Sequence, residues 1–307
     1  MTPTRGILLK LLSVTAFVAM QALIKSTEGR VPTGEVMFLR SLFALPVILG
    51  WLALRRELIE GFRTAKPMSH VWRGLAGTSA MGFGFAALQL LPLPEVTAIG
   101  YAAPLLVVIF AAMFLGEEVR AFRITAVALG MAGVIIVLAP QLSGMTGDDA
   151  GTTRALGAIL MLISAICAAL AQTFVRKMVA TERAATVALY FTLTSLGIST
   201  LTLPFSFALP SSHDAIALVL AGLLGGLGQS LLTSAYRFAD ASVVAPFEYA
   251  SMLLAIGIGF FIFGEIPTLM TLAGAALIVA AGILIIWREG KLGLERSKAR
   301  KAMTLQG

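Results

Sequence analysis

The sequence predicts an all-α membrane protein of ten transmembrane helices, arranged as a 5+5 inverted repeat. Composition is the first observation: 58% of the 307 residues are apolar and only 13% are charged, which is too little polar surface for a soluble domain. Long runs without charge are the second, and the best of them (74–94, 96–116, 155–175 and 215–236) reach the roughly 20 residues that a helix needs to cross a bilayer. Because hydrocarbon offers the backbone no water, such runs should be helical. An internal duplication is the third observation.

Ten spans follow from the hydropathy pattern. The first two are interrupted by Lys10 and Arg40, and the loop between the fifth and sixth is rich in Gly, Thr and Asp, as expected of a linker. We place the spans at residues 6–25, 34–54, 72–92, 96–115, 122–140, 155–175, 185–207, 215–236, 242–263 and 267–287.

The distribution of basic residues predicts the orientation. With the N-terminus inside, nineteen of the 23 Lys and Arg fall on the inner side, three (Lys25, Arg30 and Arg154) fall outside, and Arg40 lies within the membrane. This bias is the positive-inside signal. It predicts a multi-pass protein of a bacterial-type inner membrane with both termini cytoplasmic. The net charge of +7 is therefore an orientation signal, and no nucleic-acid partner is expected.

The duplication is visible as polar and glycine matches at two fixed offsets. Because each half would hold five spans, an odd number, the second copy enters the membrane from the opposite face, a design found in many secondary transporters. The predicted units are residues 1–145 and 150–290, followed by a cytoplasmic basic tail at 291–307. The matches are Tyr101 with Tyr249, Gly116 with Gly264 and Glu117 with Glu265 at offset 148, and Gly6 with Gly157, Ser13 with Ser164, Gln21 with Gln172 and Lys25 with Arg176 at offset 151.

The two copies differ at a charge inside the membrane. Glu248 lies within the ninth span, whereas the matching position in the first half is Gly100. An ionisable group in hydrocarbon is costly and usually faces a cavity or a partner. Glu248 is therefore a candidate for substrate or proton binding, and structural neutralisation by protonation or a hydrogen bond is the alternative. Arg40 is the second intramembrane charge, either a substrate or gating residue or a side chain that snorkels to the interface.

Other polar side chains at span positions complete the substrate-binding or gating candidates. Gln229 and Tyr236 share a helical stripe with Gly222, which indicates either a cavity wall or close helix packing. The remaining candidates are Gln21, Gln89, Tyr101, Gln172 and Tyr249. Glu117 and Glu265 stand at span ends, where a carboxylate would cap the next helix.

The sequence lacks the residues that a metal site or an enzyme active site would need. One cysteine (Cys167) and two distant histidines (His70 and His213) do not make a metal site, so neither metal nor cofactor is expected. No nucleophile–base pair or H-E-x-x-H stands in a span, which disfavours an intramembrane enzyme. A non-transporting scaffold or receptor would need neither the inverted repeat nor a buried Glu248.

Short motifs at span ends carry a family resemblance over residues 6–287. They are Phe38-Leu39-Arg40, Arg73-Gly74, Leu115-Gly116-Glu117-Glu118, Ala235-Tyr236-Arg237 and Phe263-Gly264-Glu265. With the five-plus-five duplication, these motifs resemble the EamA-type ten-helix transporters of the drug/metabolite transporter superfamily. The resemblance implies a secondary transporter of small organic metabolites.

Within that family, residues 34–40 and 243–249 resemble the branch of riboflavin and S-adenosylmethionine uptake carriers. Riboflavin uptake is the leading expectation, because aromatic and amide side chains suit a flat ring system. S-adenosylmethionine uptake and amino-acid or amine export are the alternatives. The expected partners are the lipid bilayer, a small-molecule substrate and, at most, a second copy of the chain in a homodimer.

Overall fold

The computed structural model describes residues 3–115, 121–143, 149–178, 181–205, 207–239 and 241–304. Every element assigned within these ranges is helical, as expected for an all-α protein. Nine helical segments in the same ranges are long and apolar enough to cross a membrane. Helix α4 is as long as these but does not reach the same hydropathy, because His70, Arg73 and several glycines dilute its apolar residues.

The helices follow one another through short loops. In the first half they are α1 (Pro3–Lys25), α2 (Thr33–Leu54), α3 (Leu58–Gly61), α4 (Pro67–Leu90), α5 (Leu93–Gly100), α6 (Ala102–Leu115) and α7 (Ala121–Ser143). In the second half they are α8 (Asp149–Met178), α9 (Ala184–Thr202), η2 (Leu203–Phe205), α10 (Ser212–Phe238), α11 (Ala241–Val244), η3 (Ala245–Tyr249), α12 (Ala250–Phe263) and α13 (Leu269–Thr304).

Two of the expected spans are broken rather than continuous. The span expected at 96–115 is divided at Tyr101 into α5 and α6, and Pro104 explains the break because its ring cannot pack against the carbonyl group of Gly100 in a regular helix. The span expected at 242–263 contains the 3₁₀ turn η3, with Pro246 near its start. The breaks place Tyr101 and Glu248 where the backbone is irregular.

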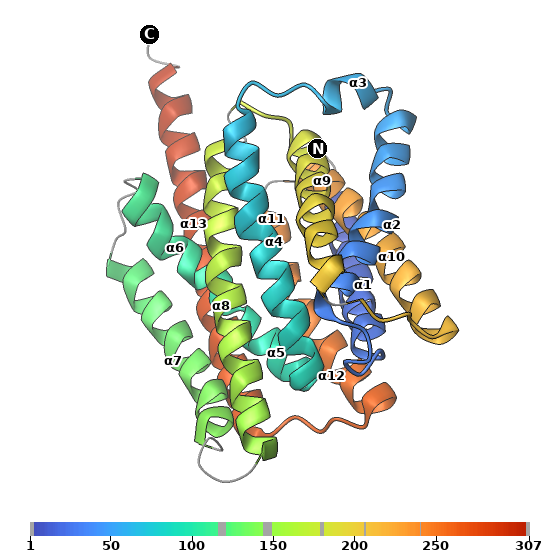
Figure 1. Cartoon of the computed structure of the whole chain (residues 1–307). Coiled ribbons are helices and arrows are strands. Elements are labelled where there is room, and N and C mark those ends of the chain that lie inside the picture. The colour runs from blue at the N-terminus through green and yellow to red at the C-terminus, as the bar shows by residue number, and fades with distance from the viewer. Residues whose placement is uncertain are drawn as a thin grey trace.

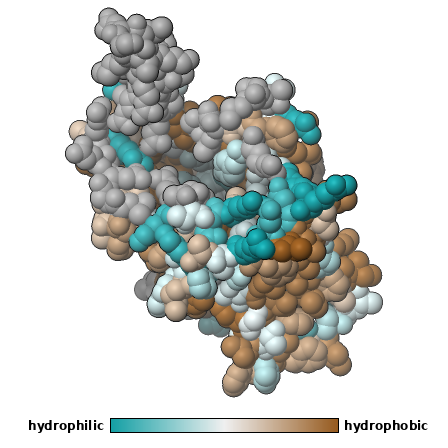
Figure 2. Space-filling model, turned by 90° about the horizontal axis from the view of Figure 1, so that it is seen from above, coloured by the Kyte–Doolittle hydropathy of each residue, from teal (hydrophilic) through white to brown (hydrophobic). Residues whose placement is uncertain are grey.

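The bundle is built mainly from contacts between the two halves of the chain. The most extensive helix pairs are α4 with α8, α1 with α10, and α7 with α13, and Figure 1 shows these helices side by side in one bundle. Both termini lie toward the upper end in that view. Seen from this upper end, hydrophilic residues gather on its surface (Figure 2).

Close contacts at glycines recur at positions separated by the two sequence offsets of 148 and 151 residues. A β-carbon at Gly74 of α4 would lie 2.6 Å from Thr194 of α9, and one at Gly222 of α10 would lie 2.6 Å from Phe43 of α2. Gly222 is 148 residues after Gly74, and Thr194 is 151 residues after Phe43. Small residues let membrane helices approach closely, so both pairs keep the same close packing.

Candidate functional site

Lys10 and Glu248 form an ion pair between the two halves. Lys10 lies on α1 with only 4% of its side chain exposed, whereas the side chain of Glu248 on η3 is 48% exposed. The sequence alone shows Lys10 as an interruption of the first span and as one of the nineteen inner-side cations, and it does not predict this partner. The ion pair explains how Glu248 is accommodated inside the membrane, because a charge in hydrocarbon is tolerated when an opposite charge accompanies it.

Tyr101 and Tyr249, which match in the duplication, meet beside this pair. Their rings pack edge to face with 5.1 Å between centroids. The Tyr101 hydroxyl lies 2.6 Å from the hydroxyl oxygen of Ser251, whose own oxygen is 2.6 Å from the carbonyl oxygen of Glu248. Tyr236 is half-exposed on α10; it follows Ala235, whose carbonyl oxygen would lie 3.2 Å from a β-carbon placed at Gly6, one turn before Lys10 on α1. Four of the predicted residues therefore gather around Lys10: Tyr101, Tyr236, Glu248 and Tyr249.

Arg40 lies apart from that cluster, on α2 against α10. Its side chain is buried, with 5% of the residue exposed, and a β-carbon at Gly225 would lie 2.9 Å from its Nε atom and 3.0 Å from the sulfur of Met20. The guanidinium group is thus inside the bundle, which argues against the snorkelling alternative. Arg73 of α4 also points inward and stacks on the ring of Phe191, 4.0 Å from its centroid. From its position near a span end, Arg73 is expected to be one of the nineteen inner-side cations, and the inward direction of its side chain is not predicted.

The glutamines are less well gathered. Gln21 and Gln229 are half-buried on α1 and α10, but Gln172 is exposed on α8. Gln89 lies near the lower end, where its amide nitrogen is 3.5 Å from the carbonyl oxygen of Val31. The structure therefore does not bring Gln89 and Gln172 to the Lys10–Glu248 cluster.

The lower end is closed by polar contacts between the halves. Glu265 forms an ion pair with Lys25, with 2.8 Å between the charged atoms, and accepts a hydrogen bond of 2.8 Å from the backbone N–H of Leu93. The sequence predicts that Glu265 caps the helix that follows it, α13. This prediction is wrong, because Glu265 caps the N-terminus of α5 in the other half. Arg30 and Asp214 add a second ion pair at 2.8 Å. Glu117, the match of Glu265, lies outside the described residues.

The upper end is closed by Glu182, in the loop between α8 and α9. One carboxylate oxygen accepts hydrogen bonds from the Thr64 hydroxyl and from the backbone N–H groups of Ala65 and Lys66. Burial alone would raise the pKa of Glu182, but these hydrogen bonds and the nearby His70 outweigh it and lower the pKa. The hydroxyl of Tyr190 also donates to the carbonyl of Phe62 at 3.0 Å.

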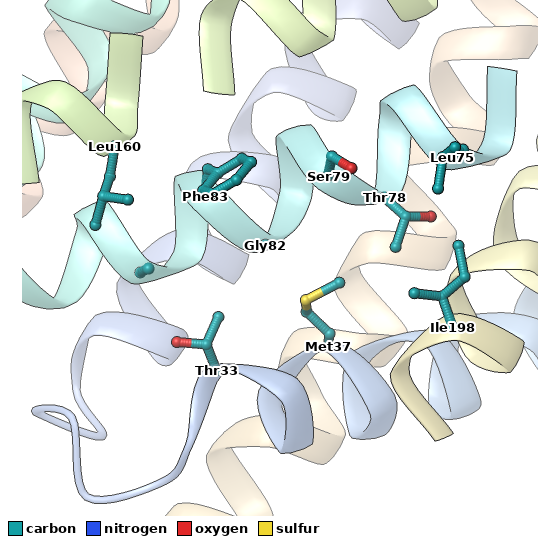
Figure 3. A pocket seen from close by; sticks show the side chains of 10 residues that line it. Thr33, Met37, Leu75, Thr78, Ser79, Gly82, Phe83, Leu160 and Ile198 are labelled. Carbon is teal, nitrogen blue, oxygen red and sulfur yellow. The ribbon is translucent and has the colours of Figure 1, made fainter. Parts of the chain in front are cut away.

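A groove of about 380 Å³ lies between α2, α4, α8 and α9 (Figure 3). Its walls are mainly apolar, and only Thr33, Thr78 and Ser79 contribute hydroxyl groups. Arg40 and the other predicted site residues are not among its lining residues. A second groove, of about 430 Å³, includes Tyr249 and lies between α12 and α13. Neither groove contains the charged residues described above.

Comparison with known proteins gives the family. Residues 4–139 and 155–287 match the EamA-like transporter family. The chain belongs to this family. Its helices and its relatives identify a multi-pass membrane protein of a transporter family, with a small molecule as substrate.

Several named relatives of this EamA-type chain cover nearly its full length. The pseudopaline exporter CntI of Pseudomonas aeruginosa is 28% identical over 91% of this chain and 95% of the relative. The S-adenosylmethionine uptake transporter of Rickettsia bellii is 26% identical over 92% and 93%. The riboflavin transporter of Rhizobium johnstonii is 29% identical over 81% and 78%. A solved crystal structure with 22% identity covers 94% of this chain and 99% of its own, with a TM-score of 0.65, and so shares its fold.

Proposed function

We propose that this protein is a secondary transporter that moves a small organic metabolite across the bacterial inner membrane by alternating access. The nine apolar segments and α4, which is third in chain order, make ten spans. They form two inverted five-helix units, 1–145 and 150–290, and both termini are cytoplasmic. The tail at 291–307 lies on the cytoplasmic side. The upper end of Figure 1 is then the cytoplasmic end, which agrees with the basic residues of the loops there.

The observation that carries this proposal is that contacts between the halves recur in pairs. The hydroxyl of Ser13 on α1 donates to the carbonyl of Gly228 on α10, and that of Ser164 on α8 donates to the carbonyl of Ala80 on α4, both at 2.7 Å. Ser164 follows Ser13 by 151 residues, and Gly228 follows Ala80 by 148. Two equivalent interfaces of opposite orientation are what alternating access requires, because one can open as the other closes.

Polar contacts at the two ends supply the second support. Glu265 with Lys25 and Glu182 with the N-terminal backbone of α4 each join one half to the other. Each of these contacts joins the two halves at one end of the bundle, so it would have to break when that end opens and reform when it closes. That is the behaviour expected of a gate.

The sequence resemblance and the relatives support more than one substrate. Riboflavin remains the leading substrate from the sequence, with S-adenosylmethionine next, and transporters of both names are among the relatives. Amino-acid or amine export is the alternative direction, and a named exporter is equally similar in sequence.

The test is transport of radiolabelled riboflavin and S-adenosylmethionine by cells that express the protein, measured as uptake and as efflux from preloaded cells. Vector-only cells are the control. A saturable flux of either compound above the control is expected. Equal fluxes in both cell types, with the protein present in the membrane, would remove both compounds as substrates.

The orientation has its own test. Single cysteines at positions 30, 210 and 266 should react with an impermeant thiol reagent from outside intact cells, and cysteines at the exposed positions 62 and 183 should react only after permeabilisation. A Cys167→Ser background removes the native thiol. If all five positions react from one side, the inverted five-plus-five arrangement is wrong.

A further inference from the structure

Within the described residues, two guanidinium groups inside the bundle lack an acidic partner: that of Arg40, which is buried, and that of Arg73, which is partly buried. In the described part of the chain, no hydrogen bond or ion pair reaches the side chain of Arg40 or Arg73, and Arg40 Nε, Arg73 Nε and Arg73 Nη1 are enclosed without a partner. Each guanidinium carries five N–H donors and stays charged in proteins. Buried donors without acceptors are uncommon and call for an explanation.

The two charges also act on each other. Arg40 and Arg73 lie on neighbouring helices: the sulfur of Met37 on α2, three residues before Arg40, would lie 3.1 Å from a β-carbon placed at Gly82 of α4, the helix of Arg73. Repulsion between the two guanidinium groups therefore adds to the cost of burying them. Two carboxylates of the described chain have partners elsewhere: Glu248 pairs with Lys10, and Glu182 accepts a hydrogen bond from the backbone N–H of Ala65, just before α4. Glu35, one turn and a half before Arg40 on α2, accepts from the backbone N–H of Ala208. An anionic ligand would balance the two positive charges.

We propose that Arg40 and Arg73 form the binding site for the carboxylate of a substrate that joins an amino-acid group to an aromatic body. This inference rests on the proposed transport function and specifies its substrate class. Guanidinium groups bind carboxylates through paired, charge-assisted hydrogen bonds. The free Nε of Arg40 and the free Nε and Nη1 of Arg73 provide donors from two helices.

The surroundings suit the rest of such a substrate. Phe191 presents a ring face that already holds Arg73, and Met20 lies beside the same glycine as Arg40. Aromatic faces and flexible thioether side chains accommodate planar, polarisable ligands. Between the two candidate substrates, the site favours S-adenosylmethionine, which carries a carboxylate, over riboflavin, which carries none.

A thiol next to Arg40 can report this site without knowledge of the natural substrate. In a Met20→Cys/Cys167→Ser protein in membrane vesicles, we would measure reaction rates with a sulfonatoethyl and a trimethylammonioethyl methanethiosulfonate. Each rate is divided by the rate of the same reagent with a free thiol. The anionic reagent should be favoured by about 10-fold, because two cations attract it at short range. Arg40→Gln combined with Arg73→Gln should remove the preference, and Arg63→Gln, at an exposed loop position, should keep it.

The ligand arm uses S-adenosylmethionine and decarboxylated S-adenosylmethionine, which differ only by the carboxylate. Only the carboxylated compound should slow the labelling, and Arg40→Gln should weaken that protection by about 10- to 100-fold, the range for a lost charge-assisted hydrogen bond. A preference for the cationic reagent, no reaction with either reagent, equal protection by both compounds, or protection by neither would overturn the proposal.

Labelling does not depend on transport, so the two proposals fail separately. An anion preference with selective protection in a protein that moves neither compound would leave the site standing and remove the transport function. Riboflavin transport by a protein without the anion preference would do the reverse.

Discussion

The interface of α1 and α10 with α2 and η3 holds the Lys10–Glu248 ion pair and the buried Arg40. At the matching positions its counterpart, the interface of α8 and α4 with α9 and α5, holds the uncharged residues Met161, Gly100 and Phe191, although Arg73 of α4 stacks on Phe191. We call the two the charged interface and the apolar interface. In the charged interface Lys10 pairs with Glu248. In the apolar interface the matching residues are Met161 and Gly100, and the Cε atom of Met161 lies 2.9 Å from where a Gly100 β-carbon would be.

The same difference recurs one layer away. Arg40 lies against Gly225, with 2.9 Å between its Nε atom and a β-carbon placed there, and Phe191 lies against Gly77, with 2.9 Å to its ring. Phe191 follows Arg40 by 151 residues, and Gly225 follows Gly77 by 148. Both interfaces have a glycine at this position, Gly225 or Gly77, which we call a glycine notch. The side chain that packs against it is Arg40 in one interface and Phe191 in the other.

The features that the two interfaces share are packing contacts, which we call the scaffold, and the features that differ are charged side chains that can bind substrate or ions. Close packing at glycines and hydroxyl-to-carbonyl bonds can be duplicated without cost to either half. A buried charge is expensive wherever it stands, so a second copy of Lys10, Glu248 and Arg40 would add cost unless it were used. We infer that ion coupling belongs to the charged interface, that Arg73 is the one residue of the apolar interface that joins Arg40 in binding, and that the rest of the apolar interface serves as a packing counterpart.

The largest effect is expected at the ion pair of the charged interface. Glu248→Gln keeps the shape of the side chain but leaves the ammonium group of Lys10 buried without its counter-charge, and the initial transport rate per inserted molecule should fall about 10-fold or more. Met161→Leu in the apolar interface should change little, because it conserves volume. Rates between about pH 5.5 and 8 show whether a titrating group is involved.

The exchanged pair, Lys10→Glu with Glu248→Lys, sharpens this result. It should recover more membrane-inserted protein than either single reversal, because only the double variant restores opposite charges. If Glu248→Gln transports at the wild-type rate with the same pH profile, the pair is structural and the two interfaces differ in stability alone.

The second effect compares the two glycine notches. Gly225→Ala places a methyl group 2.9 Å from Arg40 Nε, the far end of a flexible side chain, so the guanidinium should move and transport should fall several-fold at nearly normal stability. Gly77→Ala meets the stiff ring of Phe191 at 2.9 Å, and overpacking of this kind typically costs about 1–3 kcal/mol of stability.

Gly257→Ala is the control, since nothing lies within 4 Å of a β-carbon there. Transport rates and melting temperatures in the same detergent separate the two outcomes. A Gly225→Ala protein that transports normally would mean that the position of Arg40 is unimportant.

Much of the fold follows from local sequence. The asymmetry between Glu248 and Gly100 is also predictable from the sequence, by comparing the two halves at an offset of 148 residues. Helix positions depend on runs of apolar residues, and the breaks at Tyr101 and η3 have proline as their cause. The ion pair could not be predicted, because Lys10 and Glu248 are 238 residues apart and no local pattern links them. The inward direction of the Arg73 side chain could not be predicted for a related reason. A cation near a span end has the same sequence pattern as an orientation signal, whether its side chain points outward or inward.

The third effect concerns the gate at the upper end. The lowered pKa of Glu182 means that its carboxylate stabilises the fold above its unfolded pKa of about 4.3, and that this contribution is lost as the pH falls through the folded value. Glu182→Gln should lower the melting temperature at neutral pH and flatten its decline below about pH 5. Glu60→Gln is the control, because its ion pair with Arg183 is solvent-exposed and should contribute little. Parallel pH curves for the wild type and Glu182→Gln would contradict the assignment.

The smallest effect tests whether the two scaffolds are equivalent. Ser13→Ala and Ser164→Ala each remove one hydroxyl that donates to a carbonyl of a facing helix at 2.7 Å. Hydrogen bonds between membrane helices contribute about 0.6 kcal/mol on average, so each variant should lose a similar, small amount of unfolding free energy. The double variant should lose their sum, because the two bonds lie in different interfaces and share no partner. Denaturation of the four proteins in one detergent measures all three differences. If Ser13→Ala costs several times more than Ser164→Ala, the interfaces differ in packing as well as in charge, and the separation of scaffold from chemistry fails.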